Sequence, residues 1–197
     1  QLRENTKLNV EALNQERSRI TELLQNRGYF RFHKEYIIYR IDTLQEQHLA
    51  DVTLVLRPYR TNNCPDTLHT RYGIRQITYA SGDPQDSVIH LRQHVLRENT
   101  FIEEGKPYSA EGLQNTYNHF GRLDAVRYTN ISFQQDPDSA LLDALIQLQT
   151  NKPSTLSFQP EGTNTAGDLG AAASLTYQNR NLFRGSETFS VQLRGDD

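Results

Sequence analysis

The sequence predicts an α+β protein in which two related modules, each with a helix on a small sheet, precede a segment of long alternating strands. The first observation is a repeated pentapeptide, Leu-Arg-Glu-Asn-Thr, at residues 2–6 and again at 96–100. The second is a helical pattern after each copy, ending at Gly28 and at Gly121, so that the glycines recur at nearly the offset of the pentapeptides. The third is a pair of alternating apolar runs after each helix. Self-similarity at one period indicates an internal repeat.

Each helix has its own local signals. The first is predicted to end at Gly28, which supplies the left-handed residue that commonly follows a helix. Its stripe is apolar with one arginine in the middle, at Val10, Leu13, Arg17, Ile20 and Leu24. In the second copy Ser109 is the expected N-cap and Gly121 the expected stop. The stripe of that helix is Leu113, Tyr117 and Phe120.

The runs after the helices alternate between apolar and other residues and are predicted strands. They span residues 36–42 and 51–57 in the first copy, and 126–133 and 141–149 in the second. Upstream of the second copy, residues 72–79 have a strand pattern. Residues 84–96 have a helix pattern, with Asp83 as N-cap and Pro84 at the first helical position. A complete unit therefore reads β-α-α-β-β.

The first copy lacks the opening strand and helix. Because the first residue is also Gln and not Met, we expect the sequence to be a piece of a longer protein. Residues 1–59 are assigned to the incomplete module and residues 70–150 to the complete one. The polar connector at 58–70 is long enough for a hinge or for a docked loop, so the orientation between the modules stays open. It contains the lone Cys64, which we expect to be a free thiol.

Composition narrows the class of protein. The chain is 36% hydrophobic and 23% charged, which is typical of a folded domain and not of a disordered segment. No apolar run approaches the length of a membrane-spanning helix. The net charge of −3 supplies no general basic field, so nucleic acid is not an expected partner.

Residues 151–197 change in character, with alternation in two runs joined by a turn-rich segment. One face of this hairpin is apolar, with Leu169, Ala171, Ala173, Leu175, Tyr177, Phe189, Val191 and Leu193. The other face is small and polar. Strands of this length and pattern fit a transmembrane β-hairpin with lipid on one side and a lumen on the other. A hairpin of a soluble β-sandwich would alternate in the same way, and the pattern alone favours neither.

The sequence gives little support for an enzymatic function. His90 and His94 stand four apart on the predicted helix, but no third metal ligand and no Glu base accompany them. Asp136, Asp138 and Asp143 lack the Gly and terminal Glu of a calcium loop. The sequence also lacks a phosphate-binding Gly-rich loop and a nucleophile elbow. We therefore expect no catalysis, no cofactor and no metal site.

Several features taken together resemble the BamA/TamA superfamily of outer-membrane assembly proteins, a surface-antigen-like family. These are the two helix-strand-strand modules, Asn-Arg-Gly-Tyr-Phe at 26–30, Gly-Thr-Asn-Thr-Ala-Gly at 162–167 and Asn-Leu-Phe-Arg-Gly-Ser-Glu at 181–187. The resemblance implies an α+β fold of tandem POTRA modules, each a small mixed sheet with two helices on one face. It also implies that residues 151–197 are the first strands of an outer-membrane β-barrel, which favours the lipid-facing reading of the hairpin.

The resemblance further implies an assembly factor of the outer membrane with its POTRA modules in the periplasm. Its partners would be unfolded β-barrel precursors, outer-membrane lipid and periplasmic partner subunits. An open sheet edge can bind an extended chain through backbone hydrogen bonds, whatever its side chains. The strand that follows each helix is the candidate edge. The residues expected to pair with a substrate strand are Tyr36, Ile38, Arg40, Val126, Tyr128 and Asn130.

Two other functions remain open at this stage. A two-partner secretion transporter for one dedicated substrate would couple the same kinds of module to a barrel. A soluble β-rich adhesion or scaffold protein would carry the hairpin in a sandwich. The sequence also does not separate a general insertase from a TamA-like branch. Because a hairpin cut from a barrel exposes an apolar face and open edges, we expect residues 169–194 to be poorly ordered, self-associating or packed on a neighbour.

Overall fold

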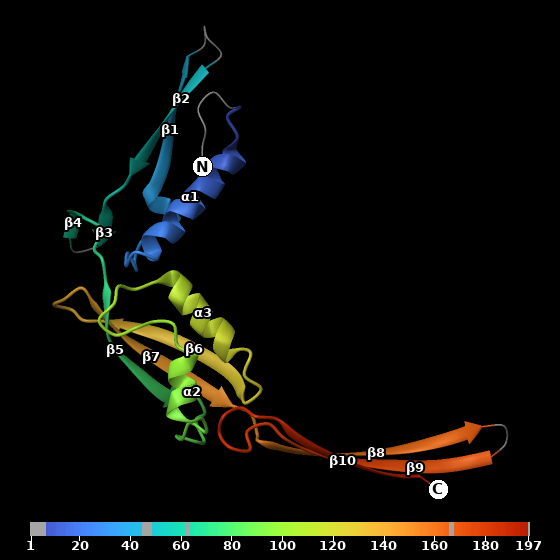
Figure 1. Cartoon of the computed structure of the whole chain (residues 1–197). Coiled ribbons are helices and arrows are strands. Elements are labelled where there is room, and N and C mark those ends of the chain that lie inside the picture. Colours follow the sequence, from blue (N-terminus) through green and yellow to red (C-terminus); the bar gives the residue numbers. More distant parts are fainter. Residues whose placement is uncertain (1–6, 45–48, 62–63, 166–167, 197) are drawn as a thin grey trace. The chain divides into compact units, whose positions relative to one another are not determined.

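The computed structural model describes residues 7–44, 49–61, 64–165 and 168–196. The described residues form two compact units. Figure 1 labels the helices and strands, coloured from the N-terminus to the C-terminus. The first unit takes its residues from Gln1–Gln76, Ile102–Gln114 and Gln134–Asp143, and the second from Ile77–Phe101, Asn115–Phe133 and Ala144–Asp197. The first therefore holds the first module and one end of the second module. The second unit holds the other end of that module and the C-terminal strands.

The first module consists of a helix and a β-hairpin. Helix α1 (Val10–Gln25) begins at Asn9, whose side chain accepts the Glu11 N–H at 2.9 Å. After the helix Gly28 adopts a φ of 100°, as predicted from its place at the helix end. A short 3-10 helix, η1 (Lys34–Tyr36), leads into β1 (Ile37–Leu44), which pairs antiparallel with β2 (Leu49–Leu56).

Helix α1 buries only part of the predicted stripe. Leu13 is 6% exposed, whereas Val10, the first residue of the helix, is 70% exposed, so the prediction is wrong for Val10. Ile20 and Leu24 are half-buried. Arg17 explains the interruption of the stripe, because its guanidinium reaches across and donates to the Lys34 carbonyl at 3.0 Å.

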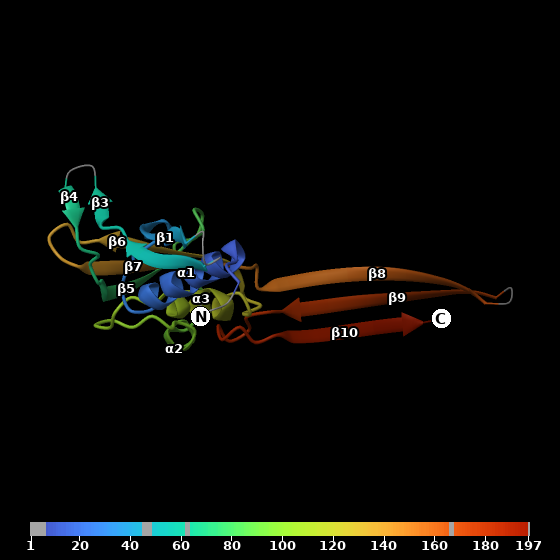
Figure 2. The same cartoon turned by 90° about the horizontal axis from the view of Figure 1, so that it is seen from above.

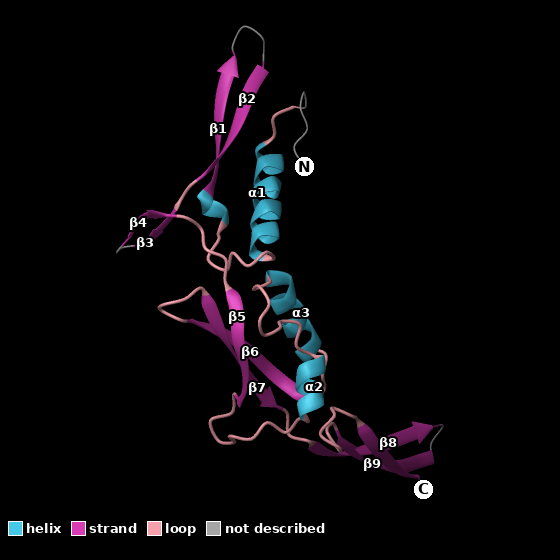
Figure 3. Ribbon diagram, turned by 60° about the vertical axis from the view of Figure 1, so that its left-hand side comes forward, coloured by secondary structure: helices cyan, strands magenta, loops and turns pink. Residues whose placement is uncertain are grey.

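The second module has the predicted β-α-α-β-β order. Its elements are β5 (Gly73–Ser81), α2 (Gln93–Glu98), α3 (Ala110–Phe120), β6 (Val126–Gln135) and β7 (Leu141–Thr150). The sheet order is β5-β7-β6. The Gly73 N–H donates to the Ala140 carbonyl and the Gly82 N–H to the Leu148 carbonyl, so β5 runs parallel to β7. Since β6 and β7 are joined as a hairpin, the sheet is mixed, and Figure 3 shows both helices on one side of it.

The core of this module lies on the inner face of β7. The alternate residues Leu142, Ala144, Ile146 and Leu148 are at most 1% exposed. Helix α3 contributes Phe120 and Thr116, both fully buried. Ser109 is the N-cap of α3 as predicted, accepting the Gly112 N–H at 3.1 Å. Thr116 was not part of the predicted stripe. Its buried hydroxyl has a hydrogen-bond partner, because it accepts the Phe101 N–H at 2.9 Å.

The helix predicted over residues 84–96 is wrong for most of its length. Only α2, starting at Gln93, is helical. The carboxylate of Asp83 accepts the Gln85 N–H and that of Asp86 accepts the Val88 N–H, both at 2.9 Å. Aspartate side chains that bind nearby amides compete with the helical hydrogen-bond pattern and favour turns. His90 therefore lies in a loop before α2, and His94 lies within the helix.

The connector between the modules lies in the first unit, where the Arg31 guanidinium donates to the Tyr59 hydroxyl at 2.7 Å. It contains a small hairpin of β3 (Tyr59–Thr61) and β4 (Cys64–Thr67), where the sequence predicts only loop. At its end the Tyr72 N–H donates to the Gly28 carbonyl at 2.7 Å. The side chain of Asn26 accepts the Glu111 N–H, at the start of α3, at 2.8 Å. Phe30 packs edge-on against Tyr72 and Tyr108, with centroid distances of 6.0 and 5.0 Å.

The C-terminal strands form a three-stranded antiparallel sheet in the order β10-β9-β8, shown from above in Figure 2. Its strands are β8 (Ser154–Thr165), β9 (Asp168–Asn179) and β10 (Phe189–Asp196). The sequence predicted β9 and β10 but not β8. Pro160 weakened the strand signal there, and it is accommodated because β8 lies at an edge of this sheet. Among the described residues, no helix is both long enough and apolar enough to span a membrane.

Candidate strand-pairing and lipid-contact surfaces

Strand β6 contains three of the residues expected to pair with a substrate strand. It lies at one edge of the described sheet, as expected for the strand after the helix, with β5 at the other edge. Tyr128 is 59% exposed on the face away from Ile131, which is buried. Asn130 donates from its side chain to the Gln147 side chain on β7 at 3.0 Å. Val126 is half-buried at the start of the strand.

The direction of the backbone groups along β6 follows from the hairpin. The Asp136 N–H donates to the Leu141 carbonyl at 3.0 Å, which makes this a hydrogen-bonded pair. In an antiparallel ladder such pairs alternate, so every second residue of β6 turns its N–H and C=O toward β7. By this count Asn130 bonds to β7, and the backbone groups of Thr129 and Ile131 point outward from the edge. At the start of the strand the Asn151 N–H donates to the Ala125 carbonyl at 2.8 Å, one residue out of that register, so the count does not extend to Arg127 and Tyr128.

The middle of the outward edge is covered by a side chain from α3. The Ile131 N–H donates to the Tyr117 hydroxyl at 2.9 Å, and that hydroxyl faces the Ile131 carbonyl at 3.4 Å. These contacts confirm that Ile131 points outward, since its backbone groups meet a side chain and not β7. The sequence placed Tyr117 in the apolar stripe of the helix. Its polar end could not be assigned, because that depends on the edge lying within reach.

The hairpin of the first module offers a second edge on β1. Tyr36 lies in η1 and not in a strand, so β1 starts one residue later than predicted. Its carbonyl accepts the Arg57 N–H at 2.8 Å and its N–H donates to His33. By the alternation rule Ile38 and Arg40 also bond to β2, and the backbone groups of Tyr39 and Ile41 point outward.

The ring of Tyr36 belongs to an aromatic cluster at the base of this hairpin. Its centroid lies 4.6 Å from that of His69 and 5.7 Å from that of Phe32. Burial raises the pKa of the Tyr36 hydroxyl. Phe32 is 1% exposed, so the cluster is part of the core of the first unit. Tyr36 therefore has a packing role that explains the aromatic residue at this position.

The register of the sheet β8–β10 places apolar side chains together on one face. Leu156 pairs with Tyr177 and Tyr177 with Val191, while Phe158 pairs with Leu175 and Leu175 with Leu193. All six are between 38% and 67% exposed. Ala173, next to Pro160 and Gly195, and Phe189 share this face. The side chains of Leu169 and Ala171 lie outside the described ones, although their backbone is part of β9.

The opposite face of the same sheet is polar. It carries three rows across the strands: Thr155, Gln178 and Ser190; Ser157, Thr176 and Gln192; and Gln159, Ser174 and Arg194. Arg194 lies 3.4 Å from the Glu161 carboxylate on this face. A sheet sorted in this way can face lipid on one side and water on the other.

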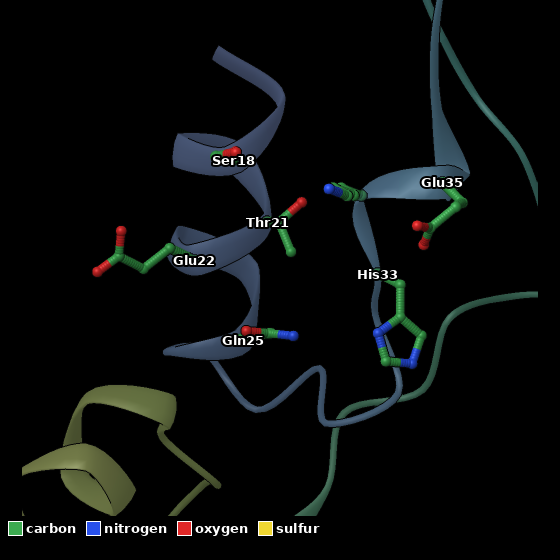
Figure 4. A pocket seen from close by; sticks show the side chains of 7 residues that line it. Ser18, Thr21, Glu22, Gln25, His33 and Glu35 are labelled. Carbon is green, nitrogen blue, oxygen red and sulfur yellow. The ribbon is translucent and has the colours of Figure 1, made fainter. Parts of the chain in front are cut away.

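A shallow hollow lies between α1 and the segment that follows it, with a volume of about 320 Å³. Figure 4 shows Thr21 and Gln25 from α1 pointing toward His33 and Glu35 across it. The amide of Gln25 is already engaged, because it donates to the Phe32 carbonyl at 2.8 Å. The hollow is open and lined by polar residues, and of these Gln25 holds the turn after the helix.

The charged clusters named from the sequence have structural roles. Arg75 on β5 forms ion pairs with Asp136, at 2.5 Å, and with Asp143. The guanidinium lowers the pKa of Asp143. His90 pairs with Asp86 at 2.6 Å. Within the described parts of the chain, His, Cys, Asp and Glu side chains form no group of three that could hold a metal ion.

Comparison with solved structures gives the fold. No protein-family model matches the chain, and no curated protein matches it significantly. The structure of BamA from Haemophilus ducreyi lacking POTRA domains 1-3 matches 99% of this chain with a TM-score of 0.68 and 13% identity. This chain spans 33% of that one, so it corresponds to about a third of its length. At this identity the likeness shows a shared α+β fold.

Two further structures match less well. BamA POTRA3-5 from Haemophilus influenzae matches 75% of this chain and 51% of its own, with 15% identity and a TM-score of 0.49. CdiB from Acinetobacter baumannii matches 96% of this chain and 31% of its own, with 9% identity and a TM-score of 0.49. These scores are too low to support an argument about the fold.

Proposed function

We propose that this chain is part of an outer-membrane assembly factor, with its two modules acting as POTRA domains in the periplasm and β8–β10 opening a membrane β-barrel. The observation that carries the proposal is the register of β8–β10, which gathers exposed apolar side chains on one face and polar ones on the other. A soluble protein rarely leaves such a continuous apolar face uncovered. The fold shared with BamA of H. ducreyi supports the same assignment.

The modules would bind unfolded β-barrel precursors by strand addition. The edge of β6 offers the outward backbone groups of Thr129, and β1 offers those of Tyr39 and Ile41. Recognition through backbone groups does not depend on the sequence of the guest, which suits a factor with many substrates. Tyr128, which is exposed on β6, would contact the side chains of the guest. No catalytic group and no cofactor enter this account.

Membrane contact would come from the apolar face. Leu156, Phe158 and Leu193 are each more than 60% exposed and lie on that face. If they meet lipid, the full-length protein should require detergent or lipid to stay monomeric. A full-length protein that is folded and monomeric in plain buffer would instead support a soluble β-rich scaffold. That result would overturn the membrane assignment.

Site-specific photo-crosslinking in the full-length protein within its own cells tests the substrate class. Probes at Tyr128 on β6 and Ile41 on β1 are exposed on candidate edges, and Arg19 on the exposed face of α1 is the matched control. We expect adducts with several nascent outer-membrane proteins at the strand probes and not at Arg19. One recurrent adduct would favour a dedicated secretion substrate or a fixed periplasmic subunit. Adducts at Arg19 alone, or at no strand probe, would contradict strand pairing by these modules.

A further inference from the structure

The segment between β9 and β10, Asn179–Thr188, has a fixed conformation held by its own side chains. The Asn181 amide oxygen accepts the Ser186 N–H at 3.1 Å, and the Glu187 carboxylate accepts the Gly185 N–H at 3.0 Å. Arg184 and Ser186 adopt φ angles of 58° and 65°. Residues other than glycine seldom adopt this left-handed conformation, and they keep it where surrounding contacts hold them.

This segment is bound to the second module at two places, all within the second unit. At the loop before α2, the Asn181 side chain donates to the His90 carbonyl at 2.6 Å, and the Arg92 N–H donates to the Arg184 carbonyl at 2.9 Å. Arg184, which has a left-handed φ, therefore supplies the carbonyl that binds the module.

The second place is the turn between α3 and β6. There the Ala125 N–H donates to the Ser186 hydroxyl at 3.0 Å, and the Thr188 hydroxyl donates to the Asp124 carboxylate at 3.0 Å. Three of the four groups that the module supplies in these two places are backbone groups, at His90, Arg92 and Ala125. Such contacts depend on the shape of the module and little on its side chains.

The covalent link between the module and the C-terminal sheet is short. It consists of residues 151–153, between the end of β7 at Thr150 and the start of β8 at Ser154. Asn151 in this link is held by the module, because its N–H donates to the Ala125 carbonyl at 2.8 Å and its side chain to the Asp124 carbonyl at 2.9 Å. The two residues that follow leave rotation about their bonds. The two places bound by Asn179–Thr188 add two attachments that are distant from it in sequence. Together the three attachments fix an orientation.

We propose that Asn179–Thr188 is a latch that makes the strands β8–β10 and the part of the second module that lies in the second unit move as one body. A displacement of the module would then be transmitted to β9 and β10 through Asn181 and Ser186. This gives a physical role to the Asn-Leu-Phe-Arg-Gly-Ser-Glu motif at 181–187, whose Asn and Ser side chains form the anchoring bonds. The proposal concerns the mechanics of the fold and does not depend on what the modules bind.

The test measures a spin-label distance in the purified full-length protein, kept in the detergent or lipid in which it folds. Labels are placed at Ser132→Cys on β6 and Gln192→Cys on β10, both exposed, with Cys64→Ser to prevent labelling there. In the parent protein we expect one narrow distance distribution. The double variant Asn181→Ala with Ser186→Ala should broaden it about two-fold, because local attachments limit such rigid-body motion.

Two matched controls separate the latch from general damage to the turn. Arg184→Gly keeps the carbonyl that accepts the Arg92 N–H and relieves the left-handed φ. Leu182→Ala changes a side chain that is 43% exposed. Both should keep the narrow distribution of the parent. An unchanged distribution in the double variant would overturn the proposal, and so would equal broadening in the controls.

Hydrogen exchange shows whether broadening reflects unfolding. The amides of Ile146 in β7 and Leu175 in β9 should stay as protected in the double variant as in the parent. If either amide exchanges faster in the double variant, the distance measurement is repeated with the single variant Ser186→Gly. Glycine accepts the left-handed conformation and removes only the hydroxyl that binds Ala125. Broadening in this variant with the core protected supports the latch, and a parent-like distribution contradicts it.

Discussion

The two modules place similar strand hairpins in different surroundings. In the second module β7 lies between β5 and β6 under two helices, and its inner residues Leu142 and Ile146 are fully buried. In the first module the described sheet has only β1 and β2 beside α1. There Val52, Leu54 and Leu56 on β2 are between 38% and 51% exposed. The same kind of alternating run is thus a core strand in one module and a half-covered strand in the other.

The comparison shows that the burial of a strand's apolar side chains depends on the elements packed against the strand and not on its alternating pattern. Val52, Leu54 and Leu56 face the same side as Ile37 on β1, and Ile37 is fully buried. Ile41, on the same face of β1, is 40% exposed, so the cover on this face is confined to the end of the hairpin at Ile37. A third strand and a second helix provide that cover for β7 in the second module. An uncovered strand of this kind is available for contact with another chain segment.

The largest expected difference between the modules is in the cost of shortening a core side chain. Ile146→Ala removes a fully buried side chain from β7 and should lower the free energy of unfolding of the second module by about 2–5 kcal/mol. Leu54→Ala, at 45% exposure on β2, should cost roughly 1 kcal/mol or less. Hydrogen exchange in increasing denaturant, read separately on β7 and β2, gives both values. Equal losses would refute the contrast in burial.

A smaller effect is expected at the glycine that follows α1 in the first module. Gly28 has a φ of 100°, and a Cβ added there would lie 3.1 Å from the Tyr72 carbonyl oxygen. Gly28→Ala should lower the free energy of unfolding of the first module by about 1–2 kcal/mol. Gly105→Ala is the matched control, because its φ is 76° with no atom within 4 Å of the added Cβ. Thermal unfolding should show a greater loss for Gly28→Ala, and equal losses would mean that the contact with Tyr72 has no effect.

The smallest effect is the contribution of one ion pair in the second module to the pH dependence of stability. The Arg75 guanidinium lowers the pKa of Asp143 below its ordinary value of 3.8. The stability that this pair adds is therefore present above that value and is lost as the pH falls through the lower pKa of the folded protein. Arg75→Met should flatten the acid limb of a plot of melting temperature against pH. Asp138→Asn, in the same turn, should leave it in place, and an unchanged limb in Arg75→Met would contradict the assignment.

The features of the fold that were predicted correctly are those set by residues close together in the sequence. Gly28 and Ser109 were found because a left-handed residue and an N-cap act within a few residues of a helix end. The helix at 84–96 failed because Asp83 and Asp86 bind neighbouring amides and form turns. Strand β8 was missed because Pro160 is tolerated only at a sheet edge, and the position of the edge depends on the tertiary fold.

On the candidate surfaces, too, the features set by the strand pattern were predicted and those set by tertiary structure were not. The apolar face of β9 and β10 was predicted from alternation, since side chains of a strand point to opposite faces in turn. The direction of backbone groups was not predictable, because it depends on which residue pair in each hairpin is hydrogen-bonded. For that reason Ile38, Arg40 and Asn130 were named, while the backbone groups of Thr129, Tyr39 and Ile41 point outward. The cover that Tyr117 provides on Ile131 depends on tertiary structure alone.

The central claim is that the edge of β6 binds an extended strand, and residue-resolved amide hydrogen exchange tests it most directly. The full-length protein and Tyr117→Phe are compared with and without an unfolded outer-membrane precursor. The account predicts that the precursor slows exchange at Thr129. The slowing should be greater in Tyr117→Phe, which frees the Ile131 N–H without changing the ring, and Tyr128→Phe should behave as the parent. Unchanged exchange along β6 in both proteins would contradict strand pairing at this edge.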